Sequence, residues 1–334
     1  MGVTIKEVAR KARVSTATVS RVINNSGSVD EGTRRIVVEA ARELKYLPHA
    51  VGRSLSTRRT DAIGLLLPDL HGEFFSEVIR GADQSAQNNK LHLLVSSSHN
   101  NQEDIKAALQ MMRGRVDGLI IMSPHISAQA LEENISQSLP LVLLNCDVDG
   151  ELFDSLTIDN FNGAFQVVKH LFSHGHKRIA IIKGTERNFD SLERLRGYRT
   201  CIEQEGAERD LHLEISGNFS EASGYDGVRK ALRLHPRPTA IFASNDSTAI
   251  GALSALREEG VKIPAEMAIA GFDDIPVARY LSPSLTSVHF GIDDLGARAV
   301  ETLLHGVREN NRHQKRRITL PTTLSIRESC GCTQ

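Results

Sequence analysis

The chain has no tryptophan and only four cysteines among its 334 residues. Aromatic residues make up 4% of it, so a large core has to be built from aliphatic side chains. The cysteines, Cys146, Cys201, Cys330 and Cys332, show neither a disulfide framework nor the spacing of a zinc site. We therefore expect reduced thiols in a cytoplasmic protein that needs no metal or other cofactor.

Signals for membranes and for catalysis are also missing. No apolar run approaches the roughly 18–20 residues of a membrane span, and the amino terminus lacks the apolar segment of a signal peptide. The sequence has no Gly-rich nucleotide fingerprint, P-loop, nucleophile elbow or HExxH motif. The pattern favours a soluble protein that is not an enzyme.

Three clusters of titratable residues need an explanation other than catalysis. The pairs Asp273–Asp274 and Asp293–Asp294 are interpreted as strand neighbours, whose side chains point to opposite faces and make no acid/base couple. The run His174–His176 has a central glycine and favours a helix C-cap over a pair of metal ligands.

Positive charge is concentrated near the amino terminus. Residues 1–60 carry 12 Lys/Arg against 5 Asp/Glu, a balance of +7, whereas the rest carries 28 against 36, a balance of −8. A basic segment joined to an acidic body is typical of a nucleic-acid-binding module attached to another domain.

Two short amphipathic helices are predicted in this basic segment. Thr4 and Glu7 have capping-box spacing before an apolar stripe. Ser15 can cap a second helix that buries another stripe. The two stripes consist of Ile5, Val8, Ala9 and Ala12, and of Val19, Val22 and Ile23. The outward face of the second helix would carry Thr16, Ala17, Ser20, Arg21 and Asn24. A helix pair with a small polar face and one arginine indicates a helix-turn-helix that fits the major groove.

A third helix and a linker are predicted to follow. Asp30 can cap the third helix, and Pro48 ends it. Its side chains Ile36, Val37, Ala40, Ala41 and Leu44 would complete a three-helix core. The basic residues 49–59 have no core of their own and are typical of a linker.

Several separate motifs in this order resemble the headpiece of LacI/GalR-family transcription regulators. They are Thr4–Ala9, Val14–Ser15, Thr18–Asn24, Thr33–Arg34 and Tyr46–Pro48. The resemblance implies that the linker folds into a hinge helix on operator DNA and inserts Leu55 into the minor groove. Gly52 stands where the family usually has alanine, which lowers helix propensity by about 1 kcal/mol.

The same resemblance implies which residues contact DNA. Arg21 would contact a base edge or phosphate, and Thr16 and Ala17 would set operator preference. Ser15, Thr18 and Arg53 would contact the DNA backbone and set the position of the protein on the duplex. The predicted DNA-binding set is Thr4, Ser15, Thr16, Ala17, Thr18, Ser20, Arg21, Asn24, Arg53 and Leu55.

From Asp61 onward, short apolar runs alternate with helix-length segments, which indicates parallel βαβ units. The runs predicted as buried strands are 63–67, 91–95, 118–122, 141–144, 179–182, 213–215, 240–243 and 268–271. Helices are expected over Phe74–Asn88 and Asp104–Arg113, and from about Arg194, Glu221 and Thr248. Two such α/β lobes resemble the periplasmic-binding-protein fold, in which a ligand lies between the lobes at the carboxyl ends of strands.

The expected fold is thus an N-terminal helix-turn-helix headpiece of three helices followed by a two-lobed core of doubly wound parallel sheets. The headpiece covers residues 1–47, the hinge 48–60 and the core 61–334. The N-lobe would take about 61–160 and 291–320, and the C-lobe about 161–290 and 321–330, so that the chain crosses between lobes near 160, 290 and 321.

The resemblance also implies a small-molecule effector site. Arg194, Asn245 and Asp273 match family motifs for hydrogen bonding to an effector, and a guanidinium with a carboxylate suits vicinal hydroxyls or a base edge. Phe74 and Phe219 fall where family members stack a ring on the effector, and Asp69 lies on the same loop as Phe74. Structural alternatives stay open: Arg194 and Asp273 as a simple ion pair, Asp246 as a helix N-cap, and Phe74, Phe75 and Phe219 as core.

These features predict a transcriptional repressor that binds a pseudopalindromic operator as a homodimer and is controlled by a small metabolite. A sugar is the favoured effector. A purine or nucleoside is the alternative, because Glu186–Asn188 resembles purine-responsive members, although the spacing to Arg194 is longer here. A solute-binding protein of the same fold is the rival from another class. A dimer is favoured over a tetramer because residues 327–334 contain no apolar heptad.

Overall fold

The computed structural model describes residues 3–24, 26–46, 59–99, 101–123, 126, 129, 131, 133, 135, 139–146, 153–309 and 315–331. The chain divides into two compact units, Met1–Asp61 and Ala62–Gln334. Most of the predicted hinge, with Arg53 and Leu55, lies outside the described residues.

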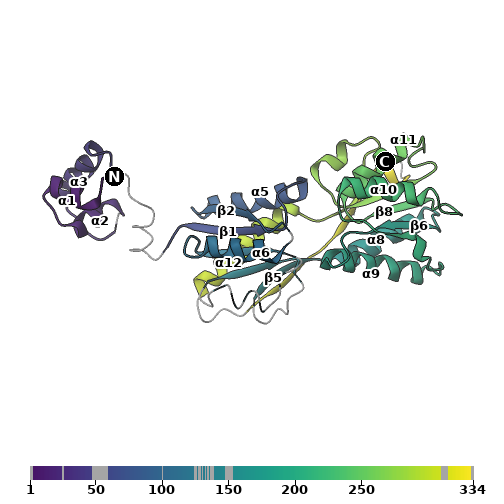
Figure 1. Cartoon of the computed structure of the whole chain (residues 1–334), viewed down its shortest axis with the longest axis horizontal. Coiled ribbons are helices and arrows are strands. Elements are labelled where there is room, and N and C mark those ends of the chain that lie inside the picture. The colour runs from purple at the N-terminus through teal and green to yellow at the C-terminus, as the bar shows by residue number, and fades with distance from the viewer. Residues whose placement is uncertain are drawn as a thin grey trace. The chain divides into compact units, whose positions relative to one another are not determined.

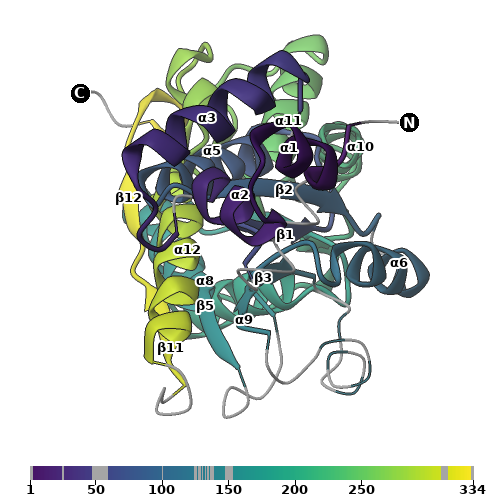
Figure 2. The same ribbon diagram turned by 90° about the vertical axis from the view of Figure 1, so that its left-hand side faces the viewer.

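The first unit is a bundle of three capped helices, α1 (Ile5–Ala12), α2 (Thr16–Ile23) and α3 (Glu31–Glu43), drawn in purple in Figure 2. The Thr4 backbone N–H donates to Glu7 Oε2 over 2.7 Å, as expected of a capping box. Ser15 Oγ accepts from the Thr18 N–H at 3.1 Å, and Asp30 accepts from two backbone N–H groups. The three predicted N-caps are therefore confirmed.

The core of this bundle is small and aliphatic. Its fully buried residues are Val8, Ala9, Ala12, Val19, Val22, Val37 and Ala40. The prediction that Ile36 joins this core is wrong, because its side chain is 56% exposed. Val37, Ala40 and Leu44 define the inward stripe of α3, and Ile36 lies about a quarter turn from its centre, since successive residues turn by about 100°.

The second unit contains two lobes, each built on a sheet that has six strands in the described part of the chain. Figure 1 shows the two lobes side by side. The N-lobe sheet has the order β11-β5-β4-β3-β1-β2 and is parallel throughout. Its strands are β1 (Ala62–Leu67), β2 (His92–Ser97), β3 (Gly118–Met122), β4 (Leu141–Leu144), β5 (Asp154–Ile158) and β11 (Arg317–Leu320). Its helices are α5 (Glu73–Asn88), α6 (Gln102–Met112) and α12 (Ile292–Glu309).

The C-lobe repeats this plan with the order β12-β10-β9-β8-β6-β7. Only β12, at the edge, is antiparallel to its neighbour among the described pairs. The strands are β6 (Ile179–Ile182), β7 (Glu214–Ile215), β8 (Ala240–Ala243), β9 (Ala268–Asp273), β10 (Thr286–His289) and β12 (Thr323–Ser325). The helices are α8 (Asn160–Ser173), α9 (Phe189–Gln204), α10 (Glu221–Ala231) and α11 (Asp246–Glu258), with 3₁₀ turns η1 (Leu211–Leu213), η2 (Pro276–Tyr280) and η4 (Glu328–Cys330).

The chain passes from one sheet to the other three times, after β5, after β10 and after β11. In both sheets the carboxyl ends of the parallel strands face the space between the lobes.

Several local predictions need correction. The run at 91–95 becomes the edge strand β2, which is not fully buried: Leu94 is 42% exposed. Asp293 and Asp294 lie in the first turn of helix α12 and not in a strand. The strands β5, β10, β11 and β12 were not predicted, because these short segments are interrupted by polar residues and lack a continuous apolar run.

Other local features agree with the sequence. The C-cap interpretation of His174–His176 is confirmed: α8 ends at Ser173 and Gly175 has φ +88°. The side chains of Cys146, Cys201 and Cys330 are buried, and burial raises the pKa of Cys146 to about 12. None of the described helices combines the length and apolar character needed to cross a bilayer.

Candidate functional site

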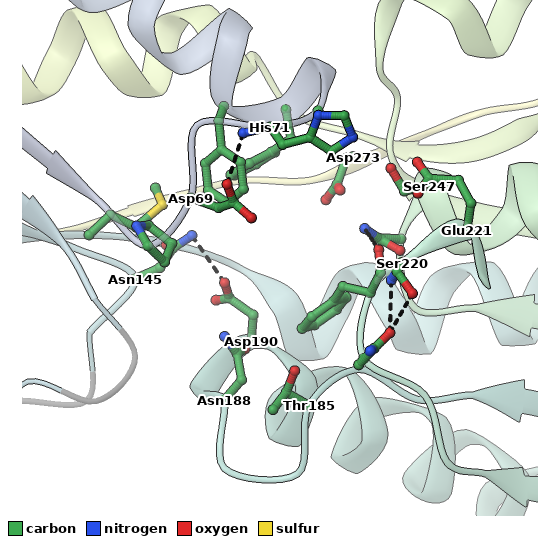
Figure 3. A pocket seen from close by; sticks show the side chains of 18 of the residues that line it. Asp69, His71, Asn145, Thr185, Asn188, Asp190, Ser220, Glu221, Ser247 and Asp273 are labelled. Carbon is green, nitrogen blue, oxygen red and sulfur yellow. Dashed lines mark hydrogen bonds between the residues drawn. The ribbon is translucent and has the colours of Figure 1, made fainter. Parts of the chain in front are cut away.

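A cavity of about 350 Å³ lies between the lobes at the carboxyl ends of their strands. Its lining comes from the segments that follow β1 and β4 in the N-lobe and β6, β7 and β8 in the C-lobe, and from the last residues of β3 and β9. The six residues predicted at an effector site, Asp69, Phe74, Arg194, Phe219, Asn245 and Asp273, all line it. Figure 3 shows part of this lining.

Arg194 is the most deeply held of these side chains, with 3% of its surface exposed. It does not begin a helix as predicted, because α9 starts at Phe189 with Asn188 as N-cap. Its Nε donates to Asn160 Oδ1 at 2.8 Å and its Nη1 to the Ser244 carbonyl oxygen at 2.5 Å. Its guanidinium also lies over the Phe272 ring, 3.6 Å from the centroid. Arg194 is therefore oriented by the C-lobe itself.

Asp273 stands opposite Arg194 at the end of β9. Arg194 Nη2 lies 3.2 Å from Asp273 Oδ1, which makes the ion pair that the sequence left as an alternative. Burial raises the pKa of Asp273 to about 7, against the opposing effect of Arg194, and the charge of Asp190 adds to the rise. Its φ of +106° departs from the ordinary strand conformation and marks a local constraint.

Asp246 stabilises the backbone conformation at Asp273. The sequence suggested it as the N-cap of α11, but that role belongs to Asn245. The Asp246 carboxylate accepts instead from Ser287 Oγ at 2.6 Å and from the Ile275 N–H at 2.9 Å. Burial, with the neighbouring charge of Asp273, raises the pKa of Asp246 well above its usual range. Asp246 is thus a positioning residue for the segment that carries Asp273.

Asn245 and Phe219 form one unit at the cavity wall. Asn245 Oδ1 accepts from the Thr248 N–H at 3.0 Å, and its Nδ2 donates to the Phe219 carbonyl oxygen at 3.1 Å. This bond holds Phe219, which has φ +69°, so that its ring packs over Gly184. A Cβ at Gly184 would lie 2.1 Å from that ring, so a larger residue there would displace Phe219.

The N-lobe supplies Asp69 and Phe74. Asp69 Oδ1 accepts from the N–H groups of Leu70 and His71, at 2.7 and 3.0 Å, which fixes the carboxylate at the strand end. Phe74 packs edge-on against Phe75, with ring centroids 5.2 Å apart. Both rings line the cavity and also pack against the core, so the two interpretations of these phenylalanines are compatible.

Several polar lining residues were not among the predicted contacts. They include His71, Asn145, Thr185, Asn188, Asp190, Asn218, Ser220, Glu221 and Ser247. Asn145 directly follows β4, so the rule that polar residues after parallel strands meet at one edge would have found it. Asp190 is the second residue of α9, and only the tertiary structure brings it to Asn145.

The headpiece presents the small polar surface that the sequence predicted for α2. Thr16, Ala17 and Arg21 are exposed, and Thr18, Ser20 and Asn24 are half-buried. Some hydroxyls already have partners within the bundle: Ser15 Oγ pairs with Thr18 Oγ1 and Ser20 Oγ accepts from Asn24 Nδ2. Thr4 Oγ1 donates to Glu7 Oε2. Arg21 is the one long charged side chain of α2.

Comparison with known proteins decides the family. Residues 4–49 match the model of bacterial regulatory proteins of the lacI family, and residues 168–330 match a periplasmic binding protein-like domain. The ribose operon repressor of Haemophilus influenzae is 35% identical, over 98% of each chain. The chain belongs to the LacI family.

Other members are similar over the whole length. The transcriptional repressor PurR of Pasteurella multocida is also 35% identical over 98% of each chain. The lac repressor dimer, solved bound to operator and the anti-inducer ONPF, is 27% identical with a TM-score of 0.86 and 99% coverage of both chains. These relatives are transcriptional repressors, so the matched LacI-family chain is a transcriptional regulator of the same architecture.

Proposed function

We propose that this protein is a repressor that binds a pseudopalindromic operator as a homodimer and is switched by a small, sugar-like metabolite. The exposed face of α2 carries the DNA-binding part of the proposal, since its small side chains and Arg21 fit a major groove. The lac repressor, which is similar over 99% of the chain, is a dimer on operator in its solved structure.

The cavity supports control by a small molecule. Its volume suits a ligand the size of a monosaccharide or small glycoside, and it combines phenylalanine rings with carboxylate and amide groups. Two relatives, a ribose operon repressor and PurR, are equally similar to this chain at 35% identity, so their names do not distinguish a sugar effector from a purine effector. The surplus of hydrogen-bond acceptors in the cavity favours a sugar, because hydroxyls can donate to each of them.

The hinge completes the proposal. Arg53 would contact the DNA backbone, and Leu55 would enter the minor groove between the two half-sites. With one long charged side chain in α2, half-site pairing and the hinge have to supply much of the specificity.

The DNA-binding role is tested with the Arg21→Ala variant. We expect it to weaken binding to an operator selected from a random palindromic library by about 5–150-fold, because a base-edge contact contributes about 1–3 kcal/mol. Fluorescence anisotropy against salt concentration measures it, and the wild-type log–log slope should be steeply negative.

Arg42→Ala is the matched control. It removes the same charge from the last turn of α3, where the guanidinium contacts Glu39. Equal losses for the two variants would contradict the assignment of α2 as the recognition helix, and binding to neither operator nor bulk DNA would favour the solute-binding alternative.

A further inference from the structure

The cavity carries an unbalanced set of charges. Among the described residues that line it, Asp69, Asp190, Glu221 and Asp273 are acidic, and Arg194 is the single lysine or arginine. Asp69 and Asp273 lie at strand ends of the two lobes, and Asp190 lies in the first turn of α9. Figure 3 shows Asp69, Asp190 and Asp273 around one space. A ligand that enters therefore meets a surplus of acceptors and of negative charge.

The single guanidinium is already engaged. Each nitrogen of Arg194 has a partner: Nε has Asn160, Nη1 has the Ser244 carbonyl oxygen, and Nη2 has Asp273. A phosphate or carboxylate group on a ligand would have to displace one of these contacts to pair with Arg194. The buried cation thus compensates the protein's own carboxylates and is not a free anion site.

Asp190 differs from the other acids because it links the two lobes. Its Oδ1 accepts from Asn160 Nδ2 at 2.8 Å in the C-lobe. Its Oδ2 accepts from Asn145 Nδ2 at 3.4 Å, from the end of β4 in the N-lobe. Each oxygen accepts one hydrogen bond from these amides, so each keeps a lone pair that can accept a donor from the cavity. The Asp190 carboxylate lines the cavity.

We propose that Asp190 is a ligand-binding, specificity-determining residue, which with Asp69 and Asp273 selects an uncharged polyhydroxylated ligand and excludes the phosphorylated form of the same molecule. The inference rests on the proposed function, since it names the ligand class of that cavity. A sugar hydroxyl donates a charge-assisted hydrogen bond to Asp190. A phosphate group brings negative charge close to several carboxylates in a site of reduced dielectric constant, which opposes binding.

The experiment uses the full chain and paired probes: ribose with ribose 5-phosphate, glucose with glucose 6-phosphate, and adenosine with adenosine monophosphate. Thermal shift identifies binding, and calorimetry gives the dissociation constants. We expect an uncharged member to bind at least tenfold more tightly than its phosphate ester. An ester that binds as tightly as its parent, or binding by phosphate esters alone, overturns the proposal.

The residue is tested with Asp190→Asn, which keeps the shape and removes the charge, and with Asp190→Ser as a second variant. Both should lower affinity for the uncharged sugar at least tenfold, and Asp190→Asn should reduce the discrimination against its phosphate ester. The control is Asp226→Asn, since Asp226 is an exposed residue of α10 outside the cavity lining. This variant should change neither the affinity for the sugar nor the discrimination against its phosphate ester.

Operator binding by the same variants separates the two proposals. Retained operator affinity shows that a variant is folded, so unchanged sugar affinity in Asp190→Asn then overturns the role of Asp190. Failure of the wild-type chain to bind any operator contradicts the proposed regulator while leaving the ligand measurements valid.

Discussion

At the residue scale, burial acts on three carboxyl groups, two that line the cavity and Asp246, which lies next to it. Asp273, Asp190 and Asp246 all have raised pKa values, in each case first because burial penalises the charged form. Hydrogen bonds and Arg194 offset only part of that penalty. For Asp273, whose pKa is raised to about 7, this predicts that the protonation state changes near neutral pH.

The raised pKa of Asp273 sets the direction in which stability changes with pH. Because its folded-state pKa, about 7, lies above the ordinary carboxyl value of 3.8, its contribution to stability is full below about pH 4 and is lost as the pH rises through 7. We expect Asp273→Asn to narrow the difference in Tm between pH 5 and pH 8 relative to wild type. Calorimetry at several pH values measures it, with Asp226→Asn as the control; an unaltered pH profile in the Asp273 variant would show that the carboxyl does not titrate in this range.

At the element scale, each lobe brings two helices into backbone contact through glycines. In the N-lobe, α5 and α12 meet at Gly81, where a Cβ would lie 1.8 Å from the Asp293 carbonyl oxygen. In the C-lobe, α10 and α11 meet at Gly224 and Gly251, where added Cβ atoms would lie 1.9 and 1.8 Å from backbone carbonyl oxygens. The two lobes therefore use the same device to pack a pair of helices.

Gly251→Ala should separate α10 from α11 and lower the free energy of unfolding by about 1–3 kcal/mol, which corresponds to a fall in Tm of roughly 2–10 °C. The matched control is Ser254→Ala, at an exposed position of the same helix. Thermal unfolding compares the two variants. A Tm for Gly251→Ala equal to that of the control would mean that the helices can move apart without cost.

At the scale of the whole molecule, two units with separate cores have to communicate for a metabolite to control DNA binding. The headpiece has a small core of its own, and the lobes have much larger ones. Coupling between the cavity and the operator is then a free energy that works in both directions.

That reciprocity can be measured. If a sugar changes operator affinity by some factor, bound operator must change sugar affinity by the same factor, and we expect a value of about 5–150-fold. Titrations of sugar in the presence and absence of saturating operator test this, and the direction of the change shows whether the sugar is an inducer or a corepressor. Sugar affinity that is indifferent to operator would rule out allosteric control through this cavity.

The sequence by itself determined the features that depend on neighbours in the chain. Ser15 and Asp30 cap helices because their side-chain oxygens accept from N–H groups two or three residues away. At Thr4 the Glu7 carboxylate three residues on accepts from the backbone N–H. Most buried strands were predictable from continuous apolar runs. The resemblance to a known family singled out Asp69, Asn245 and Asp273, and all three line the cavity.

Only the tertiary structure decided which partners those residues have. Asn145 and Asp190 are 45 positions apart, and they meet because three chain crossings hold one sheet edge against the other. The contacts of Arg194 with Asn160 and Ser244 likewise join separate elements of the C-lobe. Periodicity and capping act within a few residues, whereas the charge balance of the cavity depends on how the lobes meet, and no local pattern in the chain encodes that.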